Sequence, residues 1–166
     1  MDASSSERGQ KWLTELLNLA GMPSSVKVEP DPPFSEDSCW ITIDEANLTP
    51  EQIECLVGPE GHVLDSIQYL MNSILNLGQS ADKQGAFTVE LAGYRLRRYS
   101  ELKKLAEYAA EKVRETGEEF EIKALSSAER RQMHTMLKAY EDLETYSRGQ
   151  EPDRRLVVRL LQGEPE

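Results

Sequence analysis

The chain has few cysteines, no long hydrophobic run and little positive charge in its first half. Only Cys39 and Cys55 occur among 166 residues, which excludes a disulfide framework and a zinc-ligand cluster and predicts two isolated buried thiols. No apolar run approaches the length of a membrane span, and residues 1–10 lack the apolar core of a signal peptide. These absences predict a cytoplasmic protein with no membrane span, no metal site and no cofactor.

The net charge of −11 at neutral pH is unevenly distributed along the chain. Residues 1–92 hold 15 acidic and 4 basic residues, whereas residues 93–166 hold 15 of each. Acidity of the whole chain argues against nucleic-acid binding, but the second half is neutral and contains a basic tract. Cations for a phosphate ligand are therefore expected in the second half.

Periodicity and turn residues predict six elements in the first half of the chain, in the order α-β-β-α-α-β. Residues 1–9 are expected to form a flexible tail. A capping box from Thr49 to Gln52, with proline at the first helical position, opens the second helix. The expected elements are a helix from Gly9 to Ala20, strands at residues 26–29 and 40–43, helices from Pro50 and after Gly61, and a strand at residues 86–91.

A Gly-x-x-Gly turn at residues 58–61 separates the last two of these helices. Glycines without side chains let a phosphate approach a helix N-terminus, so Gly58, Gly61 and the adjacent His62 are candidate RNA-binding residues. The alternative is a tight turn between packed helices, and a proline and a glutamate between the glycines favour it, because they remove an N–H donor and repel phosphate. One face of the following helix is apolar, formed by Val63, Ile67, Leu70, Ile74 and Leu77.

The second half alternates long helices with short strands. Helical spacing predicts a helix from about Tyr94 to Thr116, and the pair Phe120 and Ile122 indicates a short strand. A second capping box, from Ser126 to Glu129, opens a helix that extends to about Tyr140. Two strands finish the chain, at residues 143–146 and 156–160.

Arg130 and His134 stand four residues apart on the helix that follows Ser126, so they can reach one ligand. We expect both side chains to be exposed, opposite a buried stripe of methionine and leucine. A guanidinium fork suits phosphate, and histidine can donate a hydrogen bond or stack on a base. Nearby residues add hydroxyl groups and cations to this candidate RNA-binding site: Arg131, Ser147, Arg148, Arg154 and Arg155.

Two stretches resemble known nucleic-acid-binding sequences. The run from Gly58 to Asn72 resembles the G-x-x-G-x-x-L-D-x-x-Q-Y-L-x-N pattern of the bacterial Jag (KhpB) RNA-binding family. The Arg-x-x-x-His motif at residues 130–134 and the tail around Ser147 resemble the R-three-H domain, which binds single-stranded nucleic acid. The resemblance covers most of residues 10–160 and implies an α+β fold. A type II KH domain (α-β-β-α-α-β) is expected at residues 10–92, followed by a small α/β R-three-H domain at residues 93–162.

The resemblance implies a non-catalytic protein that binds single-stranded RNA, with single-stranded DNA as the alternative ligand, and acts as a post-transcriptional regulator or RNA chaperone. A second hypothesis is a protein-interaction module whose acidic KH domain binds a partner, such as a small KH-domain protein. An enzyme is the third. Asp65 is the only acid in the motif helix, and His62 has no evident nucleophile partner, so we predict no catalytic residue.

Overall fold

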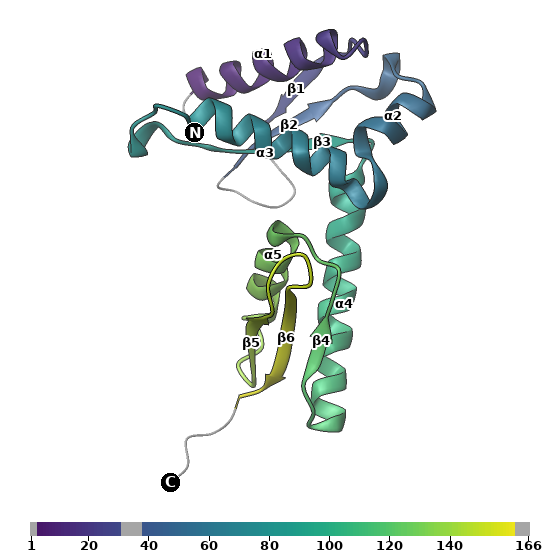
Figure 1. The fold of residues 1–166 in the computed structure, drawn as a ribbon, viewed down its shortest axis with the longest axis vertical. Coiled ribbons are helices and arrows are strands. Elements are labelled where there is room, and N and C mark those ends of the chain that lie inside the picture. Colours follow the sequence, from purple (N-terminus) through teal and green to yellow (C-terminus); the bar gives the residue numbers. More distant parts are fainter. Residues whose placement is uncertain (1–2, 31–37, 162–166) are drawn as a thin grey trace. The chain divides into compact units, whose positions relative to one another are not determined.

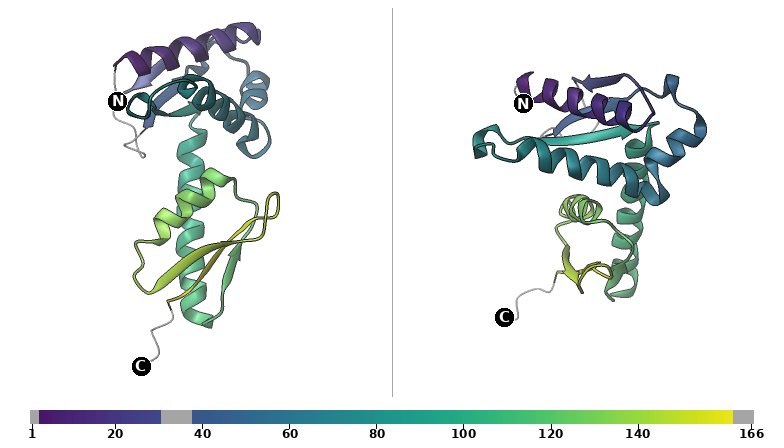
Figure 2. Two further views of the ribbon diagram at one scale, coloured as in Figure 1. Left: turned by 60° about the vertical axis from the view of Figure 1, so that its left-hand side comes forward. Right: turned by 45° about the horizontal axis from the view of Figure 1, so that its top comes forward.

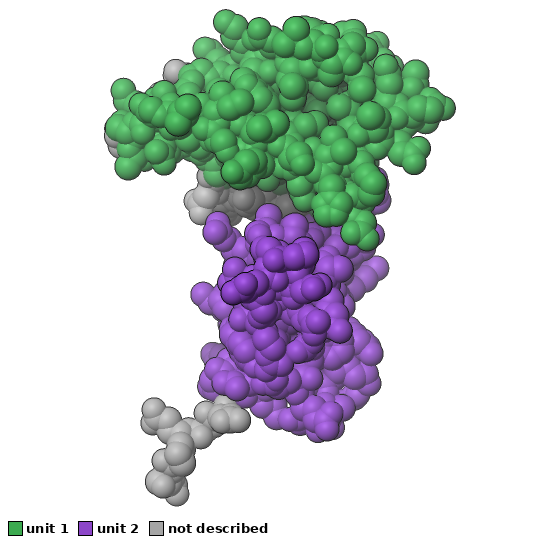
Figure 3. Space-filling model, in the orientation of Figure 1, with its two compact units in different colours: residues 1–96 green, residues 97–166 purple. Residues whose placement is uncertain are grey.

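The computed structural model describes residues 3–30 and 38–161. The chain divides into two compact units, unit 1 at residues 1–96 and unit 2 at residues 97–166 (Figure 3). The described residues form five α-helices and two three-stranded sheets, which confirms the α+β class. Each unit has its own hydrophobic core, and the expected domain limits at residues 10–92 and 93–162 stay predictions.

Unit 1 has the predicted element order (Figure 1). Its elements are α1 (Ala3–Leu19), β1 (Val26–Glu29), β2 (Ser38–Ile43), α2 (Pro50–Val57), α3 (His62–Asn76) and β3 (Ala86–Leu91). In its sheet, β2 lies in the middle, antiparallel to β1 and parallel to β3. The helices α1 and α3 pack on the sheet (Figure 2), and alternate residues of β2 and β3 point into the shared core.

Helix α1 begins at Ala3, so the expected flexible tail at residues 1–9 is wrong for residues 3–9. Contacts with residues that are distant in the sequence stabilise these additional helical turns. The guanidinium of Arg8 donates to the carbonyl of Leu75. A Cβ on Gly9 would lie 2.6 Å from the Phe87 ring, so the helix packs closely on the sheet there. Helix α2 begins as predicted, because Thr49 and Gln52 form the expected capping box.

The apolar face expected on α3 is mostly exposed. Of its five residues only Ile67 is buried, and Leu70 and Ile74 remain about half exposed, at 47% and 50%. The core contacts come instead from Leu64, Ile67 and Met71, which are spaced i, i+3 and i+7. Helix α3 carries two adjacent apolar stripes, and periodicity alone could not show which of them faces the sheet.

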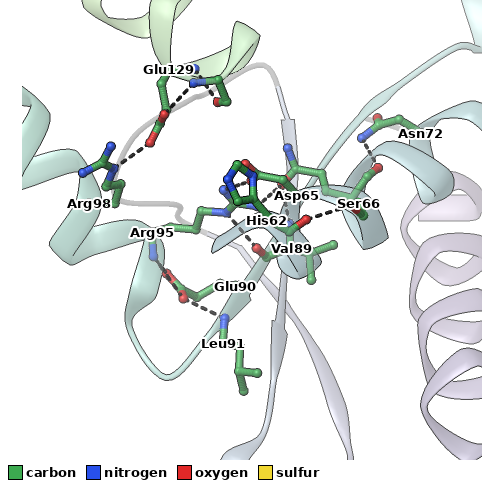
Figure 4. Close-up of polar contacts among 12 residues, drawn as sticks. His62, Asp65, Ser66, Asn72, Val89, Glu90, Leu91, Arg95, Arg98 and Glu129 are labelled. Carbon is green, nitrogen blue, oxygen red and sulfur yellow. Dashed lines mark hydrogen bonds and ion pairs between the residues drawn. The ribbon is translucent and has the colours of Figure 1, made fainter. Parts of the chain in front are cut away.

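Polar residues of α3 attach the helix to β3, the edge strand of the sheet. Asn72 brackets Phe87, donating to its carbonyl at 2.9 Å and accepting from its N–H at 2.8 Å. Gln68 accepts from the N–H of Val89 at 3.0 Å. Asp65 forms an ion pair at 2.5 Å with Arg95, which lies just after β3 at the start of the next helix (Figure 4). The two amide side chains satisfy backbone groups that an edge strand otherwise leaves to solvent, so their role is structural.

Unit 2 is a three-stranded antiparallel sheet packed against helices. Its elements are α4 (Tyr94–Thr116, which begins in unit 1), β4 (Phe120–Ile122), α5 (Ser127–Leu137), β5 (Leu143–Arg148) and β6 (Arg155–Leu160). The strand order is β4-β6-β5. The capping box of Ser126 and Glu129 is confirmed, and Glu129 also accepts from Nε of Arg98 at 2.6 Å (Figure 4).

The strand register of unit 2 sorts its side chains onto two faces. Leu156 and Val158 of β6 point inward to a core that includes Ala106, Val113 and Met133. The alternate residues, such as Tyr146 and Arg155, lie on the outer face of the sheet.

The two cysteines lie in different environments. Cys39 is buried in the core of unit 1, but Cys55 is exposed on α2, so the prediction of two buried thiols is half wrong. Within residues 3–30 and 38–161, no helix has both the length and the apolar character that crossing a membrane requires.

Candidate nucleic-acid interface

A pocket of about 320 Å³ lies between α5 and the strands that follow it. Helix α5 forms one side, and β5, β6 and the loop between them form the other. The lining residues are Ser127, Arg130, Arg131, His134, Tyr146, Ser147, Arg154 and Leu156. The structure therefore brings together five of the candidate residues from the sequence: Arg130, Arg131, His134, Ser147 and Arg154.

Arg130 is buried, so its predicted exposure is wrong. The residue is only 5% exposed, and its guanidinium donates to groups of the protein itself. Nη1 donates to the carbonyls of Leu125 at 2.6 Å and Arg154 at 3.4 Å. Nη2 donates to Oγ of Ser127 at 3.0 Å and to the carboxylate of Glu151. Arg130 thus ties the start of α5 to the loop between β5 and β6.

Helical spacing explains this burial. Arg130, Met133 and Leu137 are spaced i, i+3 and i+7, so the arginine continues the buried stripe instead of opposing it. A buried guanidinium is tolerated only when acceptors surround it, and the two backbone carbonyls and Glu151 meet that need.

His134 is half-buried at the side of the pocket. Its Nδ1 forms a hydrogen bond with the hydroxyl of Thr145 on β5. That contact fixes the ring and leaves Nε2 without a partner among the described residues, on a side chain that lines the pocket. The ring is therefore positioned to donate to a ligand or to stack against one.

Two exposed arginines complete the pocket. Arg131 and Arg154 are exposed, and neither has an ion pair with any residue that the structure describes. The hydroxyls of Ser127 and Ser147 lie at the same pocket. Guanidinium groups and hydroxyls are the donors that phosphate oxygens accept best, so the pocket suits a phosphate-containing ligand.

Arg148 and Arg155 do not line this pocket. Their side chains lie on the outer face of the sheet, on the opposite side from Ser147 and Leu156, because side chains alternate along β5 and β6. Arg148 pairs with Glu119 at 2.7 Å and with Glu121 at 2.9 Å, and Arg155 pairs with Glu121 at 2.8 Å. Their predicted part in RNA binding therefore requires these ion pairs to open.

We call this set of ion pairs the outer-face network, which consists of Glu119, Glu121, Glu144, Tyr146, Arg148, Arg155 and Arg159. Hydrogen bonds from Arg148 and then Tyr146 hold the pKa of Glu119 below its ordinary value. Arg155 and Arg148 do the same for the pKa of Glu121. The long side chains cover the sheet so well that Val157, at the centre of this face, is 0% exposed.

We expect unit 2 to lose stability as the pH falls below about 4.5, the ordinary pKa of glutamate. The folded state lowers the pKa of Glu119 and Glu121, so their ion pairs stabilise fully above the ordinary pKa. That contribution is lost as the pH falls through the folded-state values. Replacing both residues by glutamine should make thermal unfolding less dependent on pH, as measured by the NMR amide signals of β4 to β6.

Glu118→Gln is the control for this experiment, because Glu118 is an exposed neighbour without an ion pair in the described part of the chain. It should leave the pH dependence unchanged. A double variant that kept the full wild-type dependence on pH would show that the outer-face network is not its source.

The candidate residues of unit 1 have structural explanations. Gly58 and Gly61 have φ angles of 70° and 77°, which favour glycine. A Cβ on Gly61 would also collide with the ring of Tyr94. His62 is exposed and lies 3.8 Å from the carboxylate of Glu60. A tight turn between helices is therefore a sufficient explanation of the glycines, and RNA binding by these residues stays a prediction.

Sequence reasoning missed Ser127, Tyr146 and Leu156 at the pocket, and Glu151, which contacts the pocket residue Arg130. The signal for Ser127 was its place three residues before Arg130 on one helix. Glu151 had no such signal, because its contact with Arg130 spans 21 residues and depends on the path of a loop. Within the described residues, no group of three or more His, Cys, Asp or Glu side chains could hold a metal ion.

Comparison with known proteins gives consistent matches. Residues 100–160 match the R-three-H domain. The chain is 32% identical over 154 residues to the RNA-binding protein KhpB of Clostridium symbiosum, covering 93% of this chain and 65% of that protein. It is 31% identical over 114 residues to the RNA-binding protein KhpB of Bacillus subtilis (strain 168), covering 68% of this chain and 54% of that protein. The chain thus spans about half to two thirds of the length of these two curated relatives.

Proposed function

The chain belongs to the Jag/KhpB family and contains an R-three-H domain, and on that premise we propose that it binds single-stranded RNA through the pocket of unit 2. The observation that carries the proposal is the pair of exposed cations at the pocket, Arg131 and Arg154, described above. A role as a post-transcriptional regulator or RNA chaperone in the cytoplasm is part of the same proposal, as is the absence of catalysis.

The pocket offers separate partners for the backbone and the base of a nucleotide. Arg131 and Arg154 attract a phosphate, and the hydroxyl of Ser147 donates to its oxygens. His134 supplies a ring for stacking, and its Nε2 can form a hydrogen bond with the base. Unstacked bases of a single strand can enter such a pocket, whereas the bases of a duplex remain stacked inside it.

Unit 1 contributes less to phosphate binding in this proposal. Residues 1–92 carry 15 acids against 4 bases, and Glu60 places a carboxylate within the glycine turn. The exposed Glu60 lies beside His62, so it competes with a phosphate for that ring. The affinity for RNA is therefore expected to come mainly from unit 2.

The protein should bind single-stranded RNA more tightly than duplex RNA of the same sequence. The reason is that the pocket holds a stacking ring and exposed cations in one small space, which a splayed nucleotide fits. Titration of labelled single-stranded and double-stranded oligonucleotides at one salt concentration measures the difference. Equal affinity, or a preference for duplex, would contradict the proposal.

The alternative function, binding of a partner protein by unit 1, is favoured by one observation. Apolar side chains of α3 remain exposed along one stripe, from Val63 at 37% to Leu77 at 81%. An exposed apolar stripe on an acidic unit fits a protein partner, and a small KH-domain protein is the partner that the family resemblance implies. Capture experiments with and without nuclease treatment separate this function from contacts bridged by RNA.

A further inference from the structure

One carboxylate, that of Glu151, binds the guanidinium of Arg130 at the pocket. Glu151, in the loop between β5 and β6, accepts from Nη2 of Arg130 and lies 3.4 Å from the hydroxyl of Ser127. A guanidinium fork and a hydroxyl form the donor set that also suits a phosphate oxygen. Glu151 therefore binds two donors, Arg130 and Ser127, that line the pocket proposed for RNA.

We propose that Glu151 is a built-in counter-ion that competes with the phosphates of RNA for Arg130, so that RNA must displace it to bind fully. The inference rests on the proposed function, because it concerns how the same pocket is regulated. Without a ligand, Glu151 satisfies a hydrogen-bond donor of Arg130, Nη2. A ligand binds Arg130 only if its interaction is stronger than that of Glu151.

Burial identifies Glu151 as the acceptor that can be exchanged. The side chain of Arg130 is 6% exposed and that of Glu151 is 56% exposed. Nη1 is held by the backbone carbonyls of Leu125 and Arg154, which belong to the folded chain. The carboxylate instead sits on an exposed loop, where water solvates it once it leaves Arg130, and ion pairs with an exposed partner are weak.

The exposed cations explain which ligands can displace the counter-ion. A phosphate that replaces Glu151 only exchanges one anion for another at Arg130. A nucleic-acid strand also gains contacts with Arg131 and Arg154, which have no ion pair to lose among the described residues. Glu151 thus discriminates against small anions such as inorganic phosphate and in favour of a chain of phosphates.

The test compares Glu151→Gln with Asp153→Asn in the full chain, by titration with a labelled single-stranded RNA. Both variants remove one negative charge from the same exposed loop, but Asp153 has no ion pair within the described residues. We expect Glu151→Gln to bind RNA about two- to fivefold more tightly than wild type, which matches the strength of an exposed ion pair. Asp153→Asn should change affinity by clearly less.

The outcomes separate this inference from the proposed function. If wild type binds RNA and Glu151→Gln binds no more tightly than Asp153→Asn, the counter-ion inference is overturned and the function stands. Weaker binding by Glu151→Gln also overturns it, since Glu151 would then be a support for Arg130. If no variant and no wild-type protein binds, the proposed function fails as well.

A second measurement keeps the inference testable should Glu151→Gln fold poorly. In wild-type protein, the ¹³C NMR signal of the Glu151 carboxyl group should shift when single-stranded RNA is added, because the carboxylate leaves the guanidinium. Inorganic phosphate at the same phosphate concentration should shift it much less. A carboxyl signal that stays in place while RNA is bound would overturn the inference.

Discussion

Replacement of Arg130 by alanine is expected to lower the free energy of unfolding of unit 2 by about 2–4 kcal/mol. The substitution leaves the carbonyl of the buried Leu125 without its donor, and an unsatisfied buried polar group costs about 1–3 kcal/mol. The part-buried contact with the carbonyl of Arg154, at 3.4 Å, and the packing of the side chain are lost as well. Glu151 adds little to the loss, because its side chain is 56% exposed and gains water. For a unit of this size the melting temperature should fall by roughly 10–20 °C.

Thermal unfolding followed by circular dichroism and by NMR signals of unit 2 measures this effect. Arg131→Ala is the matched control, since it removes the same side chain from the next position of α5, where the residue is exposed. It should change stability by about 0.5 kcal/mol or less. A stable Arg130→Ala protein would mean that its guanidinium is not needed to hold the loop on α5.

Replacement of Arg131 and Arg154 together by alanine is expected to weaken binding of single-stranded RNA about 30- to 150-fold at low salt. Two charge-assisted contacts with phosphate are lost, and the estimate assumes about 1–1.5 kcal/mol for each, somewhat below the usual range because both side chains are exposed. The slope of log K against log salt should become shallower by about 1.4, because each phosphate contact on a single strand contributes about 0.7.

A double variant at Lys103 and Lys104 controls for the change in net charge. These lysines are exposed on α4, do not line the pocket and have no ion pair within residues 38–161. Their replacement by alanine should reduce affinity much less than the arginine double variant. Equal losses would show that RNA responds to the overall charge of unit 2 and not to this pocket.

Local signals in the sequence predicted the order of elements well. The capping boxes at Thr49 and Ser126 each satisfy free N–H groups of a first helical turn, so they mark helix starts whatever the rest of the fold does. The start of α1 was missed by six residues, because contacts of Arg8 and Gly9 with distant parts of unit 1 extend the helix. Tertiary contacts of this kind leave no local pattern.

The grouping of Arg130 and His134 was predicted from the sequence, but their environment was not. Spacing on one helix correctly brought Arg130 and His134 to one pocket, but it did not identify the arginine as a buried residue. The sequence also could not show that Ser147 lines the pocket whereas Arg148 lies on the outer face. This distinction depends on the strand register and on the acidic residues that pair with Arg148. Glu119 lies 29 residues before Arg148, and only the folded sheet brings the two together.

If unit 2 binds RNA as proposed, the outer-face network affects how the strand approaches it. Its three glutamates and three arginines cancel one another in charge, so this side of the sheet has little long-range field. Diffusing RNA is therefore drawn neither toward this face nor into unproductive encounters on it. Attraction is left to the exposed cations such as Arg131 and Arg154, so the orientation of the strand is selected during the encounter, before any contact in the pocket has formed.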